Sequence, residues 1–264
     1  MADLSNTRPN VLMETARKCM TKILTNRLSL ICKEKQVLRG SNFAGLPGES
    51  TQEPIQLLNN ICEEAREQNK ELWVLFQDTA KAFDTVNLQM LYKALIRIKI
   101  PPTTASLLLI LFQERKFWVI INDDFTDSII AGDSIDQGET ISPILWRIFY
   151  DPLLCKIQDN KNLGYTMQCT WQPNITSQES SKLELRSVAI AYMDDTTWVS
   201  HSKQNLQMIL EDAREFYLAN DSQINSSKSV LLNINSTIEK DLDNNVQAGL
   251  NRDIIQKMSS KEST

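Results

Sequence analysis

Apolar residues recur along this chain with two periods, one typical of strands and one typical of helices. Residues 72–76 are nearly all apolar, as expected for a strand covered on both faces, and residues 230–234 form a second run of strand length. Between residues 189 and 200, β-prone segments flank Asp194 and Asp195, which is typical of a tight hairpin with its acids at the tip. Apolar residues at helical spacing predict helices at 11–31, 55–65, 88–98, 103–113, 142–157 and 205–218. The chain is therefore predicted to fold as a mixed α/β (α+β) protein.

Glycine, proline and short polar runs separate these segments. Residues 40–48 contain three glycines and one proline, so they predict a loop whose backbone can approach another molecule closely. Ser142 is expected to cap the helix that Pro143 opens. Residues 159–187 are polar and lack a clear period, which predicts an irregular insertion, and residues 236–264 predict a disordered polar tail.

The composition limits the classes of protein to consider. With 264 residues, of which 42% are hydrophobic, the chain can bury one large core or two smaller ones. No apolar run approaches the roughly 20 residues that span a bilayer, and no secretory signal is visible, so no membrane partner is expected. The five cysteines are widely spaced, which favours a reduced protein of the cytoplasm or nucleus. The single histidine, His201, excludes a His-rich metal site or a Ser-His-Asp triad.

Charge is distributed unevenly along the chain. The net charge of −5 has the wrong sign for a simple nucleic-acid binder. Residues 1–40 nevertheless hold eight basic side chains against three acidic ones, so they carry +5 and the remainder carries −10. This asymmetry is compatible with a polyanionic partner together with metal-binding carboxylates, and equally with a solvated helix face.

Three carboxylates are candidates for chemistry. Crowding Asp194 against Asp195 is unfavourable unless a cation neutralises them, and hard carboxylate oxygens select Mg²⁺ or Mn²⁺. Asp123 and Asp124 also join two apolar runs, and there an ordinary solvated turn is expected. Asp78 ends the buried strand and is either a helix cap or a functional group. On the residues alone, the pair at 194 and 195 is a metal site or an acidic turn, and a third carboxylate is needed to decide.

Four short motifs follow one another in an order that carries more information than any one of them. They are Asp-x-x-x-Ala-Phe-Asp at 78–84, Gln-Gly-x-x-x-Ser-Pro at 137–143, Tyr-Met-Asp-Asp at 192–195 and Asn-x-x-Lys at 225–228. This succession resembles motifs A, B, C and D in the palm of reverse transcriptases from non-LTR (LINE-like) retrotransposons. Arg8-Pro9 and the glycine-rich loop at 45–48 resemble fingers motifs of the same group. The resemblance covers roughly residues 7–235.

The resemblance implies a role for each matching residue. Asp78, Asp194 and Asp195 would be catalytic and would hold Mg²⁺ or Mn²⁺, and Lys228 would donate a proton to the leaving pyrophosphate. Phe83 stands where the family places the ring that blocks a 2′-hydroxyl, although a core aromatic residue is the alternative. The residues expected to contact the incoming nucleotide are Arg8, Phe83, Gln137, Gly138, Tyr192 and Met193.

The resemblance also implies an activity and a division of the chain. The expected activity is that of an RNA-directed DNA polymerase that uses an RNA template, a DNA primer and deoxynucleoside triphosphates. Residues 1–70 would be partial fingers, helical and basic, residues 71–235 the palm of a right-hand polymerase fold, and residues 236–264 a disordered tail, with the thumb absent or degenerate. Glu49, where related sequences commonly carry a small or basic residue, departs from the pattern. Two alternatives remain open: an inactive relic of the same fold and a helical interaction module.

Overall fold

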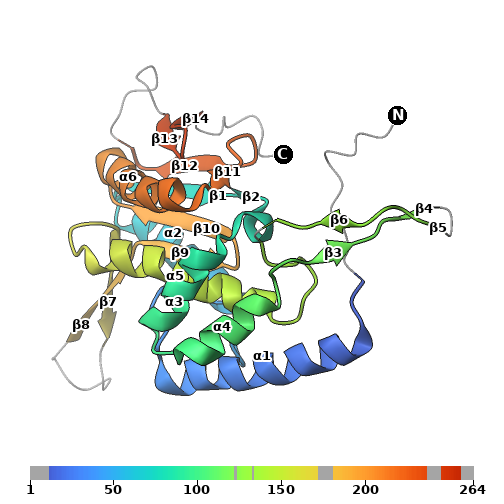
Figure 1. Cartoon of the computed structure of the whole chain (residues 1–264). Coiled ribbons are helices and arrows are strands. Elements are labelled where there is room, and N and C mark those ends of the chain that lie inside the picture. Colours follow the sequence, from blue (N-terminus) through green and yellow to red (C-terminus); the bar gives the residue numbers. More distant parts are fainter. Residues whose placement is uncertain (1–11, 122–123, 133, 172–180, 237–244, 257–264) are drawn as a thin grey trace. The chain divides into compact units, whose positions relative to one another are not determined.

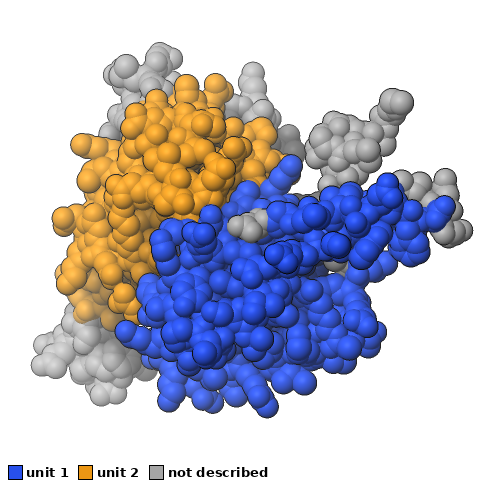
Figure 2. Space-filling model, viewed as in Figure 1, with its two compact units in different colours: residues 1–38, 45–47, 81–150 blue, residues 39–44, 48–80, 151–264 orange. Residues whose placement is uncertain are grey.

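The structure is a computed structural model that describes residues 12–121, 124–132, 134–171, 181–236 and 245–256 (Figure 1). The chain divides into two compact units, which are coloured separately in Figure 2. Unit 1 comprises Met1–Leu38, Gly45–Pro47 and Lys81–Tyr150, and unit 2 comprises Arg39–Ala44, Gly48–Ala80 and Asp151–Thr264. The units interleave along the sequence and share no boundary with the expected division after residues 70 and 235, which stays a prediction about polymerase subdomains.

Unit 2 is built on a four-stranded antiparallel sheet. Its strand order is β12 (Val230–Ile234), β1 (Leu72–Gln77), β10 (Asp195–Ser200) and β9 (Ala189–Tyr192). Strand β1 lies inside the sheet and is buried along almost its whole length, which confirms the strand that its apolar run predicts. Strands β9 and β10 pair directly and confirm the predicted acidic hairpin. A short pair, β2 (Thr79–Ala80) with β11 (Gln223–Ile224), continues from the end of β1.

The two faces of this sheet are covered by different elements. A core cluster joins Ile61 and Ala65 of α2 (Gln52–Glu67) to Leu72 and Val74 of β1, and further members come from β7, β9 and β10. Successive strand residues point to opposite faces, so Gln77 faces the other way from Leu72 and Val74. On that side Gln77 donates a hydrogen bond to Tyr217 of α6 (Lys203–Asn220), at 2.7 Å. Helix α6 therefore covers the face opposite α2.

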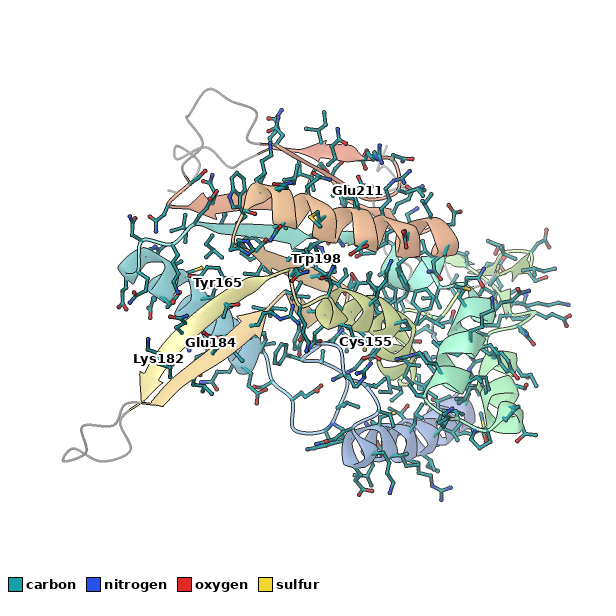
Figure 3. All side chains as sticks on the ribbon, turned by 90° about the vertical axis from the view of Figure 1, so that its left-hand side faces the viewer. Cys155, Tyr165, Lys182, Glu184, Trp198 and Glu211 are labelled. Atoms are coloured by element: carbon teal, nitrogen blue, oxygen red, sulfur yellow. The ribbon has the colours of Figure 1, made fainter. Side chains whose placement is uncertain are left out.

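In their described part, residues 159–187 are not the irregular insertion that their composition predicts. They contain the end of α5 (Ser142–Asp159) and an antiparallel hairpin of two seven-residue strands, β7 (Tyr165–Trp171) and β8 (Ser181–Ser187). Figure 3 labels Tyr165 near the base of this hairpin and the exposed Lys182 and Glu184 along β8. Only the base packs on the core, where Tyr165 and Met167 are buried, so most of the hairpin lacks the apolar pattern that sequence reading relies on.

A buried carboxylate joins this hairpin to α2. Glu64 accepts hydrogen bonds from the Tyr165 hydroxyl and from the backbone N–H of Gln168, and it forms an ion pair with Lys70. Burial alone would raise the pKa of the Glu64 carboxyl, but the hydrogen bonds from Lys70 and Tyr165 outweigh it, and the pKa lies below its usual value of 4.5. Burial, and next the Glu64 hydrogen bond, raise the pKa of Tyr165.

The expected disordered tail is wrong for residues 245–256. There β13 (Val246–Ala248) and β14 (Asp253–Ile255) form an antiparallel hairpin that contacts α6. Val246, Ala248 and Ile255 are buried, so three apolar side chains suffice to dock a segment that is polar on average. Gln207 of α6 adds a pair of hydrogen bonds to the backbone of Gln247.

Unit 1 is mainly helical. It contains α1 (Thr15–Lys35), the short 3₁₀ helix η2 (Ala82–Thr85), α3 (Leu88–Arg97), α4 (Pro102–Ile110) and the first part of α5. Four two-residue strands form narrow ribbons, β3 (Lys116–Phe117) with β6 (Ile129–Ile130) and β4 (Ile120–Ile121) with β5 (Asp124–Phe125). Asp124 is exposed, as a solvated turn predicts, whereas Asp123 is outside the described residues. Within the described part of the chain, no helix is both long and apolar enough to cross a bilayer.

We expect Gln77→Leu to destabilise the protein strongly. The Gln77 amide accepts a hydrogen bond from the Trp198 indole at 3.0 Å and donates one to Tyr217, and all three side chains are buried. Each buried polar group left without its partner costs about 1–3 kcal/mol, so the free energy of unfolding in urea should fall by about 2–4 kcal/mol. The control Gln204→Leu, on the exposed side of α6, should change it by less than about 0.5 kcal/mol. Equal effects of the two substitutions would contradict this account.

Candidate active site

The acidic hairpin turns within two residues. Tyr192 and Asp195 are paired across the ladder between β9 and β10, so Met193 and Asp194 are the two central residues of the turn. Met193 has a φ of 56°, a left-handed conformation that glycine usually supplies at the first position of such a turn. A non-glycine residue held at positive φ indicates that its surroundings impose the conformation.

Asp78 lies beside this turn. The register of β1 with β10 pairs Gln77 with Thr196, and one further step of the same register sets Asp78 next to Asp195. The hydroxyl of Thr79, the residue after Asp78, donates a hydrogen bond to the backbone oxygen of Asp194 at 3.3 Å. More than a hundred residues of sequence separate these segments, and the sheet brings their backbones together.

The Asn-x-x-Lys segment packs against the backbone of Asp78. The N–H of Asn225 donates to the Asp78 carbonyl oxygen at 2.8 Å, and the Asp78 N–H donates to the Ser229 hydroxyl at 3.3 Å. The Ser229 hydroxyl in turn donates to the Asn225 carbonyl oxygen at 2.9 Å. Lys228 lies in this short loop with an exposed side chain. Three of the four motifs that the sequence singles out are thus joined by hydrogen bonds within unit 2.

The carboxylates of this site do not form a closed cluster. Asp195 is exposed, and Asp78 and Asp194 are half-buried. Among the residues that the structure describes, no group of three or more His, Cys, Asp or Glu side chains gathers closely enough to hold a metal ion. The backbones of Asp78 and of the acidic turn adjoin, and a metal site shared by the three carboxylates stays a prediction. Three carboxylates of like charge repel one another unless a cation neutralises them.

The remaining described candidates belong to unit 1. Gln137 and Gly138 lie in a turn before α5, and Gly138 has a φ of 100°, which a side chain there would strain. Phe83 lies in η2, half-buried, with its ring centroid 5.8 Å from that of Trp146. The Phe83 carbonyl oxygen accepts a hydrogen bond from the Ile135 N–H at 3.1 Å, so both candidate segments are connected within this unit. Arg8 is outside the described residues.

A buried ionic network that sequence reasoning missed holds the turn at 136–139. Arg115 forms an ion pair with Asp136 and donates hydrogen bonds to the carbonyl oxygens of Phe112 and Ser134. Arg17 of α1 donates to Glu139 at 3.0 Å. Arg17 lies off the apolar stripe of its helix, and no local pattern in the sequence indicates a partner so far away.

The structure contradicts the expected role of Ser142 as a helix cap. Ser142 is the first residue of α5 and was expected to cap the helix, yet its hydroxyl is buried and has no hydrogen-bond partner among the described residues. The helix start is held instead from the preceding turn, where the Ser142 N–H donates to the Glu139 carbonyl oxygen at 3.1 Å. This backbone hydrogen bond closes the turn that leads into α5.

Comparison with known proteins identifies a family. The family model described as "Reverse transcriptase (RNA-dependent DNA polymerase)" matches residues 2–252. A transposon TX1 protein of Xenopus laevis is 25% identical over 86% of this chain, and an R2 retrotransposable-element Pol polyprotein of Popillia japonica is 24% identical over 87%. The probable RNA-directed DNA polymerase from transposon BS of Drosophila melanogaster is 24% identical over 56% of the chain. The chain spans 16%, 30% and 16% of these relatives, respectively.

Solved structures share the fold at low sequence identity. Apo telomerase of Candida tropicalis, truncated from the C-terminal domain, has a TM-score of 0.54, with 14% identity over 92% of this chain and 45% of its own. Telomerase of Candida albicans, in complex with a fragment of telomeric RNA, has a TM-score of 0.53, with 12% identity over 93% of this chain and 38% of its own. These similarities show a shared mixed α/β fold.

We expect Arg115→Met to weaken unit 1, because it leaves the buried Asp136 carboxylate without its main partner. Removing one member of a buried ion pair costs about 3–5 kcal/mol in free energy of unfolding, measured by urea denaturation. The matched control Lys116→Met, at the exposed neighbouring position, should cost less than about 0.5 kcal/mol. The double variant Arg115→Met with Asp136→Leu should recover part of the loss. A double variant less stable than Arg115→Met would show that the pair is not the origin of the effect.

Proposed function

Since the chain belongs to the reverse transcriptase (RNA-dependent DNA polymerase) family, we propose that it is the RNA-directed DNA polymerase domain of a non-LTR retrotransposon. The observation that carries this proposal is the hydrogen-bonded contact between the segments of Asp78, Asp194 and Asn225. These are the motifs that, by resemblance, hold the catalytic carboxylates and the proton donor. A helical interaction module has no need to join them.

The sheet of unit 2 supports the assignment of a polymerase palm. It is antiparallel, α6 and α2 cover its two faces, and Asp78 and Asp195 lie at the adjoining ends of β1 and β10. Within the proposed division, residues 71–235 are the palm and residues 1–70 belong to the fingers. The template is RNA, the primer is DNA, and the substrates are deoxynucleoside triphosphates.

The reaction joins the primer to a nucleotide. The primer 3′-hydroxyl oxygen attacks the α-phosphorus and gives its proton to solvent water. The new P–O bond forms as the bond between the α-phosphorus and the oxygen that bridges to the β-phosphate breaks, and pyrophosphate leaves. Lys228, exposed in a loop that is hydrogen-bonded to Asp78, is the proposed proton donor to the departing pyrophosphate. The exposed ring of Tyr192 and the half-buried Met193 are proposed to support the incoming nucleotide beside the acids.

The donor set suits a hard divalent cation. Asp78, Asp194 and Asp195 supply only carboxylate oxygens, from backbone segments that the sheet holds side by side, and they would hold Mg²⁺ or Mn²⁺. Such ions, when bound, supply Lewis-acid stabilisation of the charge on the hydroxyl and phosphate oxygens. The work of the protein is to keep the three backbone positions fixed while the side chains turn toward a ligand.

The unit 1 candidates are proposed to select and orient the nucleotide. Gln137 and Gly138 lie in a turn that ion pairs hold in place on both sides. A turn fixed in this way suits contact with the base or sugar of a nucleotide. Phe83 is proposed as the group that excludes a 2′-hydroxyl, and its ring packs on Trp146, which would restrain it. Arg8 is proposed to contact the triphosphate.

All five cysteines carry free thiols, which supports a reducing compartment, cytoplasm or nucleus.

We expect Asp78→Asn and Asp194→Asn each to reduce primer extension on an RNA template by at least about a hundredfold, because each removes a carboxylate ligand. The assay measures incorporation of one nucleotide with Mg²⁺ or Mn²⁺. The control Asp124→Asn alters an exposed acid of unit 1 and should leave extension unchanged. If the folded wild-type chain binds primer–template and incorporates nothing with either ion, the chain is an inactive relic of the same fold.

We expect Phe83→Ala to admit ribonucleotides more readily. Loss of the ring should raise kcat/KM for a ribonucleotide about tenfold or more relative to the matching deoxynucleotide, because a steric block is worth roughly 1–3 kcal/mol. The ratio of the two constants is independent of how much of the variant is folded. Phe149→Ala, which removes another ring that packs on Trp146, is the matched control and should leave the ratio unchanged. An unchanged ratio in Phe83→Ala would make Phe83 an ordinary core residue.

A further inference from the structure

Residues 40–44 of unit 2 lie along the outer edge of β9. The Ala191 N–H donates to the Ser41 carbonyl oxygen, and the Phe43 N–H donates to the Ala191 carbonyl oxygen, both at 2.9 Å. These bonds form a parallel bridge between Asn42 and Ala191. The segment therefore occupies the sheet edge one residue before Tyr192, where the acidic turn begins.

The side chain of Asn42 reaches the turn itself. Its Nδ2 donates to the Met193 carbonyl oxygen at 3.1 Å, and its Oδ1 accepts from the Ala44 N–H at 3.1 Å. Asn42 is only 4% exposed, so water competes little for either end of the amide. The bond that Asn42 donates ends on the residue with positive φ, which is the strained position of the turn.

The neighbouring carbonyl of the turn is held from the other side. The Asp194 carbonyl oxygen accepts from the hydroxyls of Thr79, at 3.3 Å, and Thr196, at 3.5 Å. In the sheet, β10 lies between β9 and β1. Asn42 reaches the turn from the side of β9, and Thr79 reaches it from the side of β1. Both central carbonyls of the turn are therefore fixed by side chains that come from outside the hairpin.

The segment that carries Asn42 has its own rigid support. The Gly40 N–H donates to the buried carboxylate of Asp151 in α5 at 2.8 Å. A Cβ at Gly40 would lie 2.5 Å from the Cβ of Leu154, so the backbone approaches the helix as closely as a glycine allows. Asn42 thus acts from a segment that is anchored on a helix and not from a free loop.

We propose that Asn42 is a positioning residue that holds the Met193 carbonyl and so keeps the Tyr-Met-Asp-Asp turn in the conformation that presents Asp194 and Asp195 beside Asp78. This inference rests on the proposed polymerase function. Asn42 touches neither substrate nor metal in this account. It acts through the backbone, since an amide that both donates and accepts restrains a turn that Met193 would otherwise leave for negative φ.

The test compares Asn42→Ala with Ser41→Ala, a neighbour whose side chain does not reach the turn. Amide hydrogen exchange of peptides covering residues 193–195, read by mass spectrometry, reports the turn without any need for activity. We expect exchange there to be roughly tenfold faster in Asn42→Ala and unchanged in Ser41→Ala, the factor that one hydrogen bond of ordinary strength supplies. Unchanged exchange in a folded Asn42→Ala protein would overturn the proposal.

Enzyme kinetics provide the second readout. In Asn42→Ala the Mg²⁺ concentration for half-maximal extension should rise several-fold and kcat should fall roughly tenfold, while KM for the nucleotide changes little. Glycine at position 193 tolerates positive φ, so Asn42→Ala should cost much less in a Met193→Gly background. An equal cost in both backgrounds would contradict a role in restraining Met193.

The polymerase activity and the role of Asn42 can be tested separately. If the wild-type chain extends no primer while exchange at 193–195 responds to Asn42→Ala as expected, the polymerase proposal fails and the restraint of the turn by Asn42 stands. If the wild-type chain is active and exchange does not respond, the role of Asn42 is wrong and the polymerase proposal stands.

Discussion

The antiparallel pairing of β1 with β10 is the constraint on which the candidate site depends, because it sets Asp78 beside Asp195 across a long sequence separation. Side chains on a strand alternate between faces, so a slip of one residue would turn buried Trp198 toward the wrong side and move both acids. The hydrogen bonds from Trp198 to Gln77 and from Gln77 to Tyr217 exist in one register only. These buried hydrogen bonds thus fix the register, and the register fixes the backbone positions of the two acids.

Polar contacts from distant segments then refine what the register establishes. The backbone of Asp78 is held by Asn225 and Ser229, and the turn carbonyls are held by Asn42 and Thr79. Among the described residues, no three carboxylates form a closed cluster. A backbone that is fixed in this way suits a site that must gather negative charge around a cation.

The parts that the sequence could predict are those with a local signal. The apolar run of β1 and the hairpin around Asp194 follow from the alternation and length of apolar residues, and the structure confirms both. Family resemblance added the order of the motifs, and with it the expectation that Asp78 meets the hairpin. Asn42, Thr79 and Arg17 carried no such signal, because their roles come from contacts with residues far away in sequence. The hairpin at 245–256 was missed because only a few apolar residues dock it.

The most direct test of the central claim is anomalous diffraction from crystals grown with Mn²⁺. The account predicts a peak whose protein ligands are the carboxylates of Asp78 and Asp194, with Asp195 beside them and the β1–β10 register unchanged. The peak should disappear in Asp78→Asn crystals that diffract equally well. A Mn²⁺ peak elsewhere on the protein with none at these carboxylates would contradict the account.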